Sequence, residues 1–457
     1  MQIAPEIFKA YDIRGIVGQS LTPQSVELIG RAIGSEALQQ GNQAVVVGRD
    51  GRLSGTDMRN ALVSGITATG ANVVDIGMVP TPVVYYATHV LETGASVSIT
   101  GSHNPPDYNG FKVMIGGGTL SGPAIQGLKT RILESDFQSG EGSVSAQNIV
   151  PDYIDRICGD IHLQRPFRLV IDCGNGIAGA VAPELFKRLG CEVIELFTEV
   201  DGTFPNHHPD PIDEKNLLDL KQAVAEQDAD LGFAFDGDGD RLGVVTSCGE
   251  TVWPDRQMIL FARDILGRQP GAEIIYDVKC TRTLGREIEA AGGIATMYKT
   301  GHSLIKSKLK ESGAALAGEM SGHIFFKERW YGFDDGLYAG VRMLELLAND
   351  ERSPDQVFDS LPNTLNTPEL RLELEEGEQH QLVSEVVAAA QFDDATIHTI
   401  DGLRVDFPYG FGLARASNTM PTIILRFEAD NPENLASLQS RFRQLFESVR
   451  PGLSLPF

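Results

Sequence analysis

Thr-Gly-Ser-His-Asn-Pro, at residues 100–105, is the stretch around which the rest of the sequence is organised. The preceding residues 95–99 alternate small or polar with apolar side chains, which predicts a strand. Gly101 then frees the backbone, and Pro105 and Pro106 prevent a regular continuation. Ser and Asn favour ordinary capped turns, but a hydroxyl such as that of Ser102 at a strand end is also typical of phosphate and nucleophile sites in α/β proteins.

A recurring order of elements surrounds this loop. Buried-type strands are predicted at residues 44–48, 169–172 and 274–277, and each is followed by a helical stretch and a Gly-led second strand, at 70–74, 190–194 and 292–295. Each unit then approaches a polar loop, at 100–105, 236–241 and 318–323. The repeat predicts three related α/β domains with mixed sheets, each of which presents one functional loop at a strand end.

The last part of the chain follows a different pattern. Helical spacing near residues 383–387, strands at 402–405 and 422–427, and an amphipathic final helix predict a smaller C-terminal α+β domain. We expect four domains, at residues 1–147 with the Ser102 loop, 148–250 with an aspartate loop, 251–364 with the loop at 318–323, and 365–457 with a polar loop at 415–419.

Composition excludes several classes of partner. The 457 residues carry a net charge of -24, which repels nucleic acid and anionic membranes, so an anionic ligand needs a locally basic cleft. The five cysteines are odd in number and form no C-x-x-C pair, which argues against disulfides and zinc and favours a reducing cytoplasm. The charged N-terminus is not that of a signal peptide, and no apolar run is long enough to span a bilayer.

The loop Asp-Gly-Asp-Gly-Asp-Arg at residues 236–241 predicts a metal site. Asp236, Asp238 and Asp240 follow an apolar run, and three carboxylates so close repel one another unless a cation neutralises them. Oxygen ligands suit Mg²⁺, whereas a calcium EF-hand is excluded because Arg241 and Ser247 stand where that loop needs Gly and Glu. Arg241 can hold a phosphate at the metal through paired donors.

Two further loops offer groups that recognise a sugar phosphate. Glu319, Ser321 and His323, within Gly-Glu-Met-Ser-Gly-His at 318–323, match vicinal sugar hydroxyls. The loop at 415–419 supplies a guanidinium, two hydroxyls and an amide, which suit a phosphate, from Arg415, Ser417, Asn418 and Thr419. Lys112, Lys279 and His302 follow strands or glycines, although each alone is typical of a structural or solvated residue.

Together these loops predict phosphoryl transfer on a phosphorylated sugar, with Ser102 as nucleophile. No P-loop is present, and Ser102 lacks the G-x-S-x-G elbow of acyl transferases. Two other classes stay open: a metal-dependent phosphatase with Asp236 as nucleophile, and a phosphosugar-binding protein without turnover.

The motifs resemble those of the α-D-phosphohexomutase superfamily over essentially the whole chain, and most closely its bacterial phosphomannomutase/phosphoglucomutase group. They occur in the family's order, at residues 9–15 (Lys-Ala-Tyr-Asp-Ile-Arg-Gly), 100–105, 236–241, 318–323 and 415–419. Five ordered motifs are a highly specific signal. Phosphoglucosamine mutases typically have Arg-Pro-Ser-Gly-Thr in the last loop, so Arg-Ala-Ser-Asn-Thr here favours mannose and glucose phosphates.

The resemblance implies a mechanism and a set of site residues. Four domains would surround a central active-site cleft, and phosphorylated Ser102 would convert mannose 1-phosphate or glucose 1-phosphate reversibly to the 6-phosphate through a hexose 1,6-bisphosphate. Ser102, Asp236, Asp238 and Asp240 would hold Mg²⁺, and glucose 1,6-bisphosphate would act as activator. His103, Lys112 and Arg14 lie in motifs that the family places beside Ser102, and we expect acid or base help from them.

The remaining residues are expected to contact substrate. They are Lys9, Tyr11, Arg241, Lys279, His302, Glu319, Ser321, His323, Arg415, Ser417, Asn418 and Thr419. Because mannose and glucose differ in one hydroxyl, contacts that serve two substrate orientations predict dual specificity. We expect a cytoplasmic monomer whose partner is a phosphorylated hexose, and neither nucleic acid nor membrane.

Overall fold

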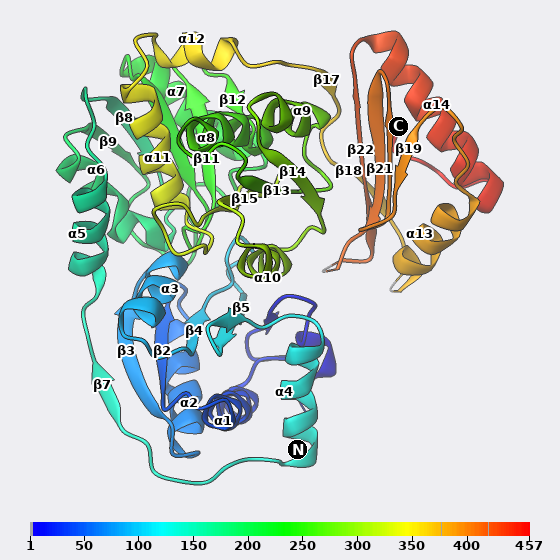
Figure 1. Cartoon of the computed structure of the whole chain (residues 1–457). Helices are drawn as coiled ribbons and strands as arrows, with labels where there is room; N and C mark the ends of the chain where they lie inside the picture. The colour runs from blue at the N-terminus through cyan, green and yellow to red at the C-terminus, as the bar shows by residue number, and fades with distance from the viewer. Residues whose placement is uncertain (1–2, 376, 419) are drawn as a thin grey trace.

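The computed structural model describes residues 3–375, 377–418 and 420–457, which form four sheets with their helices (Figure 1). The first domain, blue to cyan in Figure 1, lies below the green and yellow second and third domains, and the orange and red fourth domain stands to one side. In the described part of the chain, no helix is long and apolar enough to cross a membrane.

The first sheet has the order β1-β5-β4-β2-β3-β7, with β6 paired to β5. Its strands are β1 (Ile13–Ile16), β2 (Ala44–Arg49), β3 (Asn72–Met78), β4 (Ser96–Ile99), β5 (Tyr108–Ile115), β6 (Gly118–Thr119) and β7 (Val144–Ala146). Its helices are η1 (Pro5–Ile7), α1 (Pro23–Gln39), α2 (Gly55–Thr67), α3 (Thr81–Val90) and α4 (Pro123–Glu134). Val45 and Val47 pack in one core cluster and Val46 in another, since helices cover both faces of the sheet.

The second sheet has the order β12-β11-β10-β8-β9, and the third has the order β14-β13-β15-β16. The second domain contains α5 (Val150–Asp160), β8 (Arg168–Asp172), η2 (Ile177–Ala180), α6 (Ala182–Arg188), β9 (Glu192–Leu196), η3 (Glu214–Leu217), α7 (Leu218–Glu226), β10 (Leu231–Phe235), β11 (Leu242–Thr246) and β12 (Thr251–Val252). The third contains α8 (Pro254–Arg268), β13 (Glu273–Asp277), α9 (Arg282–Ala290), β14 (Ile294–Tyr298), α10 (His302–Ser312), β15 (Leu316–Gly318), β16 (Ile324–Phe326), α11 (Gly336–Ala348) and α12 (Pro354–Asp359).

The three sheets share one core topology, which confirms the predicted repeat. In each, two strands pair in parallel with a central first strand (β2, β8 or β13), and a fourth strand pairs antiparallel with the third. The turn from the third to the fourth strand contains residues 100–107, 236–241 and 319–323 in the three domains. Equivalent turns of three related sheets therefore present the three predicted loops.

The fourth domain is an antiparallel sheet covered by two helices, which confirms the predicted α+β class. It contains β17 (Leu365–Asn366), β18 (Leu370–Glu373), α13 (Glu378–Ala389), β19 (Thr396–His398), β20 (Leu403–Phe407), β21 (Gly410–Ala416), β22 (Thr422–Ala429) and α14 (Pro432–Val449). Strand β21 was not expected, and it places Arg415 on a strand next to the loop. The boundaries proposed for the four domains stay predictions.

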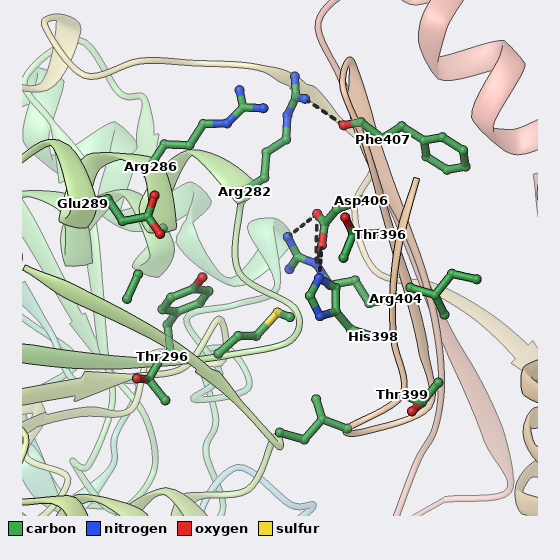
Figure 2. A pocket seen from close by; sticks show the side chains of 16 residues that line it. Arg282, Arg286, Glu289, Thr296, Thr396, His398, Thr399, Arg404, Asp406 and Phe407 are labelled. Atoms are coloured by element: carbon green, nitrogen blue, oxygen red, sulfur yellow. Dashed lines mark hydrogen bonds and ion pairs between the residues drawn. The ribbon is translucent and has the colours of Figure 1, made fainter. Parts of the chain in front are cut away.

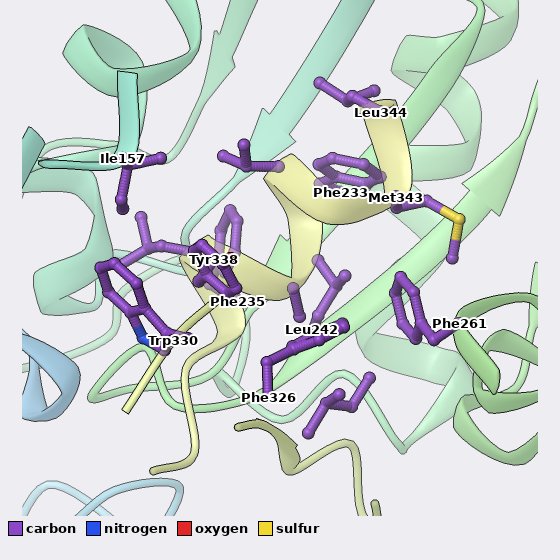
Figure 3. Packing of buried hydrophobic residues seen from close by; sticks show 14 of the residues in the cluster. Ile157, Phe233, Phe235, Leu242, Phe261, Phe326, Trp330, Tyr338, Met343 and Leu344 are labelled. Atoms are coloured by element: carbon purple, nitrogen blue, oxygen red, sulfur yellow. The ribbon is translucent and has the colours of Figure 1, made fainter. Parts of the chain in front are cut away.

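One hydrophobic cluster joins the first three domains. It includes residues of α3, α5, β10, α8 and α11, and Figure 3 shows helix α11 with Tyr338, Met343 and Leu344 among these side chains. The Trp330 ring stacks on Tyr338 with centroids 4.2 Å apart. The fourth domain has its own cluster and meets the third through a small one of Val278, Phe411 and Leu413. The first three domains therefore share one apolar core, whereas the apolar contact that attaches the fourth domain to them is much smaller than that core.

Candidate active site

The loops of the first three domains meet at Ser102. Its hydroxyl Oγ donates to Asp236 Oδ2 over 3.0 Å, which joins the first loop to the second. The backbones of Arg241 and His323 form an isolated antiparallel bridge, which joins the second loop to the third. Three equivalent turns thus form one site, because the repeat directs the same sheet edge of each domain toward a common centre.

Ser102 is held in an unusual conformation. Its φ is +48°, in the left-handed region that side chains other than those of Gly, Asn and Asp seldom adopt. The Ser102 amide donates to Thr100 Oγ1 over 2.7 Å, and the residue is 1 % exposed. Gly237 lies so close that a Cβ added to it would be 2.2 Å from the Ser102 carbonyl oxygen. Ser102 is therefore fixed by the packing of two domains.

The aspartate loop fits a divalent cation. Asp236, Asp238 and Asp240 are fully buried, and one oxygen from each lies within 4.8 Å of the others. Oδ1 of Asp238 has no hydrogen-bond partner, which is costly for a buried carboxylate, and Oδ1 of Asp240 has only the ring of His323, 3.4 Å away. Burial, and then the carboxylates of Asp240 and Asp238, raise the pKa of Asp236 well above its usual range. Orphaned hard oxygens in such a loop match the ligands that Mg²⁺ prefers.

Three cations surround the Ser102 loop. Lys112, on β5, donates to Asp238 Oδ2 over 2.7 Å and also to Asp240. Burial alone would lower the pKa of Lys112, but these two carboxylates outweigh it and raise the pKa. Arg14 donates to the side chain of Asn104, which belongs to the Ser102 loop. Arg241 is the third. Arg14 pairs with Asp12, and Arg241 Nε lies 3.7 Å from Asp236 Oδ2, so each of the three cations faces a carboxylate.

The pKa values of the two histidines at the junction are shifted in opposite directions. Burial and then Arg241 lower the pKa of His103 well below its usual range, so its neutral ring accepts at Nδ1 from Arg241 Nη2 over 2.7 Å. Ser102 Oγ lies 3.1 Å from the same nitrogen. For His323 burial alone would lower the pKa, but Asp240 and Glu319 raise it to about 9. His323 lies between the carboxylates of Asp240 and Glu319, at 3.4 and 3.2 Å, which favour its charged form.

The third loop presents Glu319 and its neighbours to the cleft. Glu319 is 1 % exposed and accepts at Oε1 from the Gly301 amide over 2.5 Å. Ser321 Oγ lies 2.8 Å from His323 Nδ1, and His302, at the start of α10, stacks on His323 with centroids 5.5 Å apart. The predicted sugar contacts thus form one network.

The fourth-domain loop meets the first and third domains at Tyr11. Tyr11 Oη donates to the Thr300 carbonyl over 2.9 Å, and Asn418 Nδ2 donates to the same hydroxyl. Arg415 pairs with Asp401 over 3.0 Å, and Lys279 pairs with Glu369 over 2.7 Å. The Ser417 amide donates to the Thr422 carbonyl over 2.8 Å. These groups form a second cationic centre, separate from the one at Ser102.

Among the described residues, one predicted site residue, Lys9, is not tied to the others by side-chain contacts. Lys9 is held by its backbone amide, which donates to the Asp12 carbonyl over 3.0 Å. Thr419 lies outside the described residues.

The sequence did not point to several residues that support the site. Arg52 donates to the carbonyl of Ser102, and Asp50 accepts from the amide of Gly101 in the same loop. Thr81, at the start of α3, donates through Oγ1 to Asp238 Oδ2 over 2.7 Å. Asp334 accepts from Lys306 over 2.7 Å and lies 3.4 Å from His302 Nδ1. The one sequence signal for such a role was the position of Arg52 in Arg-Asp-Gly-Arg, three residues after strand β2 ends at Arg49.

Arginines of the fourth domain hold the backbone around Lys279. Arg404 Nη1 donates to the carbonyls of Val278 and Cys280, each over 2.7 Å, and Arg426 donates to the carbonyl of Lys279. Figure 2 shows Arg404 with Asp406 and His398 beside a cavity of about 1010 Å³ between the third and fourth domains. None of the predicted site residues lines that cavity. Lys279 therefore depends on the docking of the fourth domain.

Comparison with known proteins identifies the family. Family models described as "Phosphoglucomutase/phosphomannomutase" match the chain in order: alpha/beta/alpha domain I at residues 5–139, domain II at 151–249, domain III at 253–365 and the C-terminal domain at 369–445. The phosphomannomutase/phosphoglucomutase of Pseudomonas aeruginosa is 53% identical over 451 residues, which cover 99% of this chain and 97% of the relative. The phosphoglucomutase of Neisseria meningitidis is 54% identical over 458 residues, 99% of each chain.

A solved structure agrees with these relatives. The phosphoglucomutase/phosphomannomutase family protein of Burkholderia thailandensis is 53% identical, covers 100% of both chains and gives a TM-score of 0.95. Fold, site and relatives define a phosphohexomutase, an enzyme of the isomerase class. The chain belongs to the phosphoglucomutase/phosphomannomutase family.

Proposed function

We propose that this enzyme interconverts mannose 1-phosphate or glucose 1-phosphate and the corresponding 6-phosphates through phosphorylated Ser102 and a hexose 1,6-bisphosphate. The observation that carries the proposal is the contact of Ser102 Oγ with Asp236 Oδ2, 3.0 Å, which puts a serine nucleophile against a buried carboxylate triad. The relatives named phosphomannomutase/phosphoglucomutase support the substrate class.

Two cationic centres support a cycle that needs two phosphates. Lys279, Arg415, Ser417 and Asn418 would bind the phosphate that does not react, while Lys112, Arg14 and Arg241 would neutralise the phosphoryl group at Ser102. In the first half the serine O–P bond breaks as a sugar hydroxyl forms a new O–P bond, and the hydroxyl proton ends on Ser102 Oγ. After the bisphosphate reorients, Ser102 Oγ forms a bond to the other phosphorus, the O–P bond to the sugar breaks, and the serine proton ends on the sugar oxygen.

The residues of this chain would orient the sugar between the two centres. Glu319 and Ser321 would accept from and donate to its hydroxyls in either orientation, and binding energy at the distant phosphate would align the reacting hydroxyl. Asp236, Asp238 and Asp240, with a phosphate oxygen on Ser102, would hold Mg²⁺, which supplies Lewis-acid neutralisation of the phosphoryl oxygens when bound.

The histidine and lysine beside Ser102 would have different roles. Lys112 stays a cation between two carboxylates, which suits charge stabilisation more than proton transfer, because its raised pKa makes it a weak proton donor and leaves it no free lone pair to act as a base. Neutral His103 would hold Arg241 against the phosphoryl group through its Nδ1. Arg14 would hold the Ser102 loop through its hydrogen bond to Asn104, and its positive charge would stabilise the phosphoryl group at Ser102.

A phosphatase with Asp236 as nucleophile is the second candidate, and the geometry disfavours it. Asp236 Oδ1 accepts from the amides of Asp240 and Arg241, over 3.1 and 3.2 Å, and Oδ2 accepts from Ser102. These bonds fix the carboxylate of Asp236 against its own loop and Ser102, which favours a role as a metal ligand over a role as the attacking group. The relatives, which are named as mutases over essentially the whole chain, count against the third candidate, a binding protein without turnover.

The test is turnover of both 1-phosphates with Mg²⁺ and catalytic glucose 1,6-bisphosphate, the proposed activator. Ser102→Ala should abolish isomerisation, whereas Ser96→Ala should not, because Ser96 is a fully buried serine of β4 whose Oγ contacts no polar partner. Release of inorganic phosphate that survives Ser102→Ala would reject the mutase. Comparing kcat/KM for the two sugars tests dual specificity. Cytoplasmic location and a monomeric state remain predictions.

A further inference from the structure

We propose that Arg52 is a positioning residue for phosphoryl transfer: its buried guanidinium sets the conformation of the loop that presents Ser102. The inference rests on the proposed function, since it assumes that Ser102 is the group that reacts. Arg52 does not contact the Ser102 hydroxyl, so its effect passes through the backbone of the loop.

One guanidinium binds both ends of the Ser102 loop. Nη2 donates to the carbonyls of Ser102 and Asn104, over 2.8 and 2.6 Å. Nη1 donates to the carbonyls of Pro105 and Tyr108, over 2.5 and 2.9 Å. Three carbonyls of the loop and that of Tyr108, the first residue of β5, thus converge on one side chain, which replaces the backbone partners that a helix or sheet would provide in the loop.

Asp50 completes this support. Its Oδ2 lies 3.3 Å from Arg52 Nε and accepts from the Gly101 amide over 3.2 Å, while Oδ1 accepts from the Arg52 amide over 3.0 Å. Both side chains are essentially buried. The pair therefore offers donors to the loop carbonyls and an acceptor to the loop amide, and it keeps the buried charge balanced.

Packing holds the guanidinium in place. A Cβ added to Gly101 would lie 2.3 Å from Arg52 Cζ, so only glycine lets the loop approach this closely. On another side the ring of Phe204, from the second domain, has its centroid 5.2 Å from Cζ. Contact with Gly101 and Phe204 leaves the planar group little freedom, and it ties the Ser102 loop to the second domain, which also contains the aspartate triad.

The geometry requires arginine and not lysine. Four carbonyls are reached by a planar fork, whereas a lysine ammonium has three donors at one point. Ser102 has φ +48°, and such strain persists only where the surroundings over-determine it. Without the fork we expect the loop to relax and Ser102 Oγ to move from its place 3.0 Å from Asp236. A displacement of about 1 Å at a reacting atom costs about 100-fold in rate.

The experiment compares Arg52→Lys and Arg52→Ala with Arg59→Ala in the full-length enzyme. Arg59 is a half-buried arginine of the same domain that pairs with Asp75 over 2.5 Å and contacts none of the site residues described above. Arg59→Ala therefore shows how much the loss of an arginine–aspartate ion pair in this domain alone changes activity. We expect kcat for glucose 1-phosphate to fall about 100-fold in both Arg52 variants. KM should change little, because the phosphate-binding residues lie elsewhere, and Arg59→Ala should keep the wild-type kcat.

Chemical rescue separates positioning from general damage. Millimolar methylguanidinium should restore part of the kcat of Arg52→Ala but not of Arg52→Lys, where the side chain fills the space, and tetramethylammonium at equal ionic strength should restore neither. A wild-type kcat in Arg52→Lys, or a loss that follows the fraction unfolded, would overturn the proposal. If Arg52→Ala does not fold, Arg52→Lys, which keeps a cation beside Asp50, provides the kcat and KM test.

Ser102→Ala, measured in parallel, separates a failure of the proposed mutase function from a failure of the role proposed for Arg52. If Ser102→Ala keeps its activity, the proposed function fails whatever the Arg52 variants do. If Ser102→Ala is inactive and Arg52→Lys is fully active, the mutase stands and the role of Arg52 is rejected.

Discussion

Replacing Arg404 with alanine should loosen the fourth domain and weaken substrate binding. Arg404 is 2 % exposed and donates to the carbonyls of Val278 and Cys280, each over 2.7 Å. Its guanidinium lies 3.9 Å from the centroid of Phe411 and pairs with Asp406. The substitution removes these contacts at the junction where Lys279 stands, so it tests whether docking of the fourth domain sets the position of Lys279.

The magnitude follows from the bonds lost. Hydrogen bonds from a charged donor are worth about 1.5–3 kcal/mol each. The cavity of about 1010 Å³ beside Arg404 lets water reach the freed carbonyls, so we take the lower value for both bonds. The docking free energy should therefore fall by about 3 kcal/mol, which is about 100-fold in the docking equilibrium.

Limited proteolysis and steady-state kinetics provide the assay. The segment at residues 362–364, just before β17, is exposed or half-exposed, and cleavage there should accelerate as docking weakens. KM for the hexose phosphate should rise with a smaller change in kcat, because Ser102 and its loop remain intact. Arg441→Ala is the control, since Arg441 pairs with Asp394 over 2.7 Å within the fourth domain. Arg404→Ala with wild-type cleavage and wild-type KM would refute the reasoning.

Three further predictions concern charge. Glu369→Gln should lower KM for the hexose phosphate, because Glu369 accepts a hydrogen bond from Lys279 Nζ over 2.7 Å and competes with the phosphate for that cation. A raised KM would instead mean that Glu369 orients the lysine. Burial raises the pKa of Asp335 to about 7, so the folded protein keeps a proton that the unfolded chain loses above about pH 4. Stability should consequently fall between about pH 4 and 7, by at most about 4 kcal/mol. Thermal unfolding measured across that range should show a smaller fall for Asp335→Asn, and equal slopes would contradict the assignment. Chelation by EDTA should stop turnover and added Mg²⁺ should restore it, with Asp238→Asn needing more Mg²⁺ than wild type; turnover that persists in EDTA would reject the metal role of the triad.

The repeated order of elements was predictable because it is encoded locally. Buried strands such as residues 44–48 and 274–277 are apolar runs, and glycines mark the helix ends between them. The three polar loops were also visible, since each contrasts with the apolar strand before it. What the residues could not show is that the loops meet, because only the shared topology brings the same sheet edge of each domain to Ser102.

Strand β21 was missed for a physical reason. Its glycines weaken the strand pattern, yet each is required by packing. A Cβ on Gly412 would lie 2.3 Å from the Phe442 ring of helix α14, and one on Gly410 would lie 2.1 Å from the Glu428 carbonyl. Tertiary contacts therefore select glycine where the local propensity argues against a strand.

The supporting arginines were missed because their partners are backbone carbonyls, which every residue has and which no sequence pattern displays. Arg52 binds four carbonyls around Ser102, and Arg404 with Arg426 binds three consecutive ones around Lys279. In both places a carboxylate two residues away, Asp50 or Asp406, balances the buried charge. The same spacing occurs at both loops, with one residue between the Asp and the Arg, in a strand or shortly after one. Where the nearby carboxylates are too few to pair with all the donors of such an arginine, the remaining donors need backbone carbonyls. The spacing therefore points to a loop whose conformation is held by hydrogen bonds to its carbonyls.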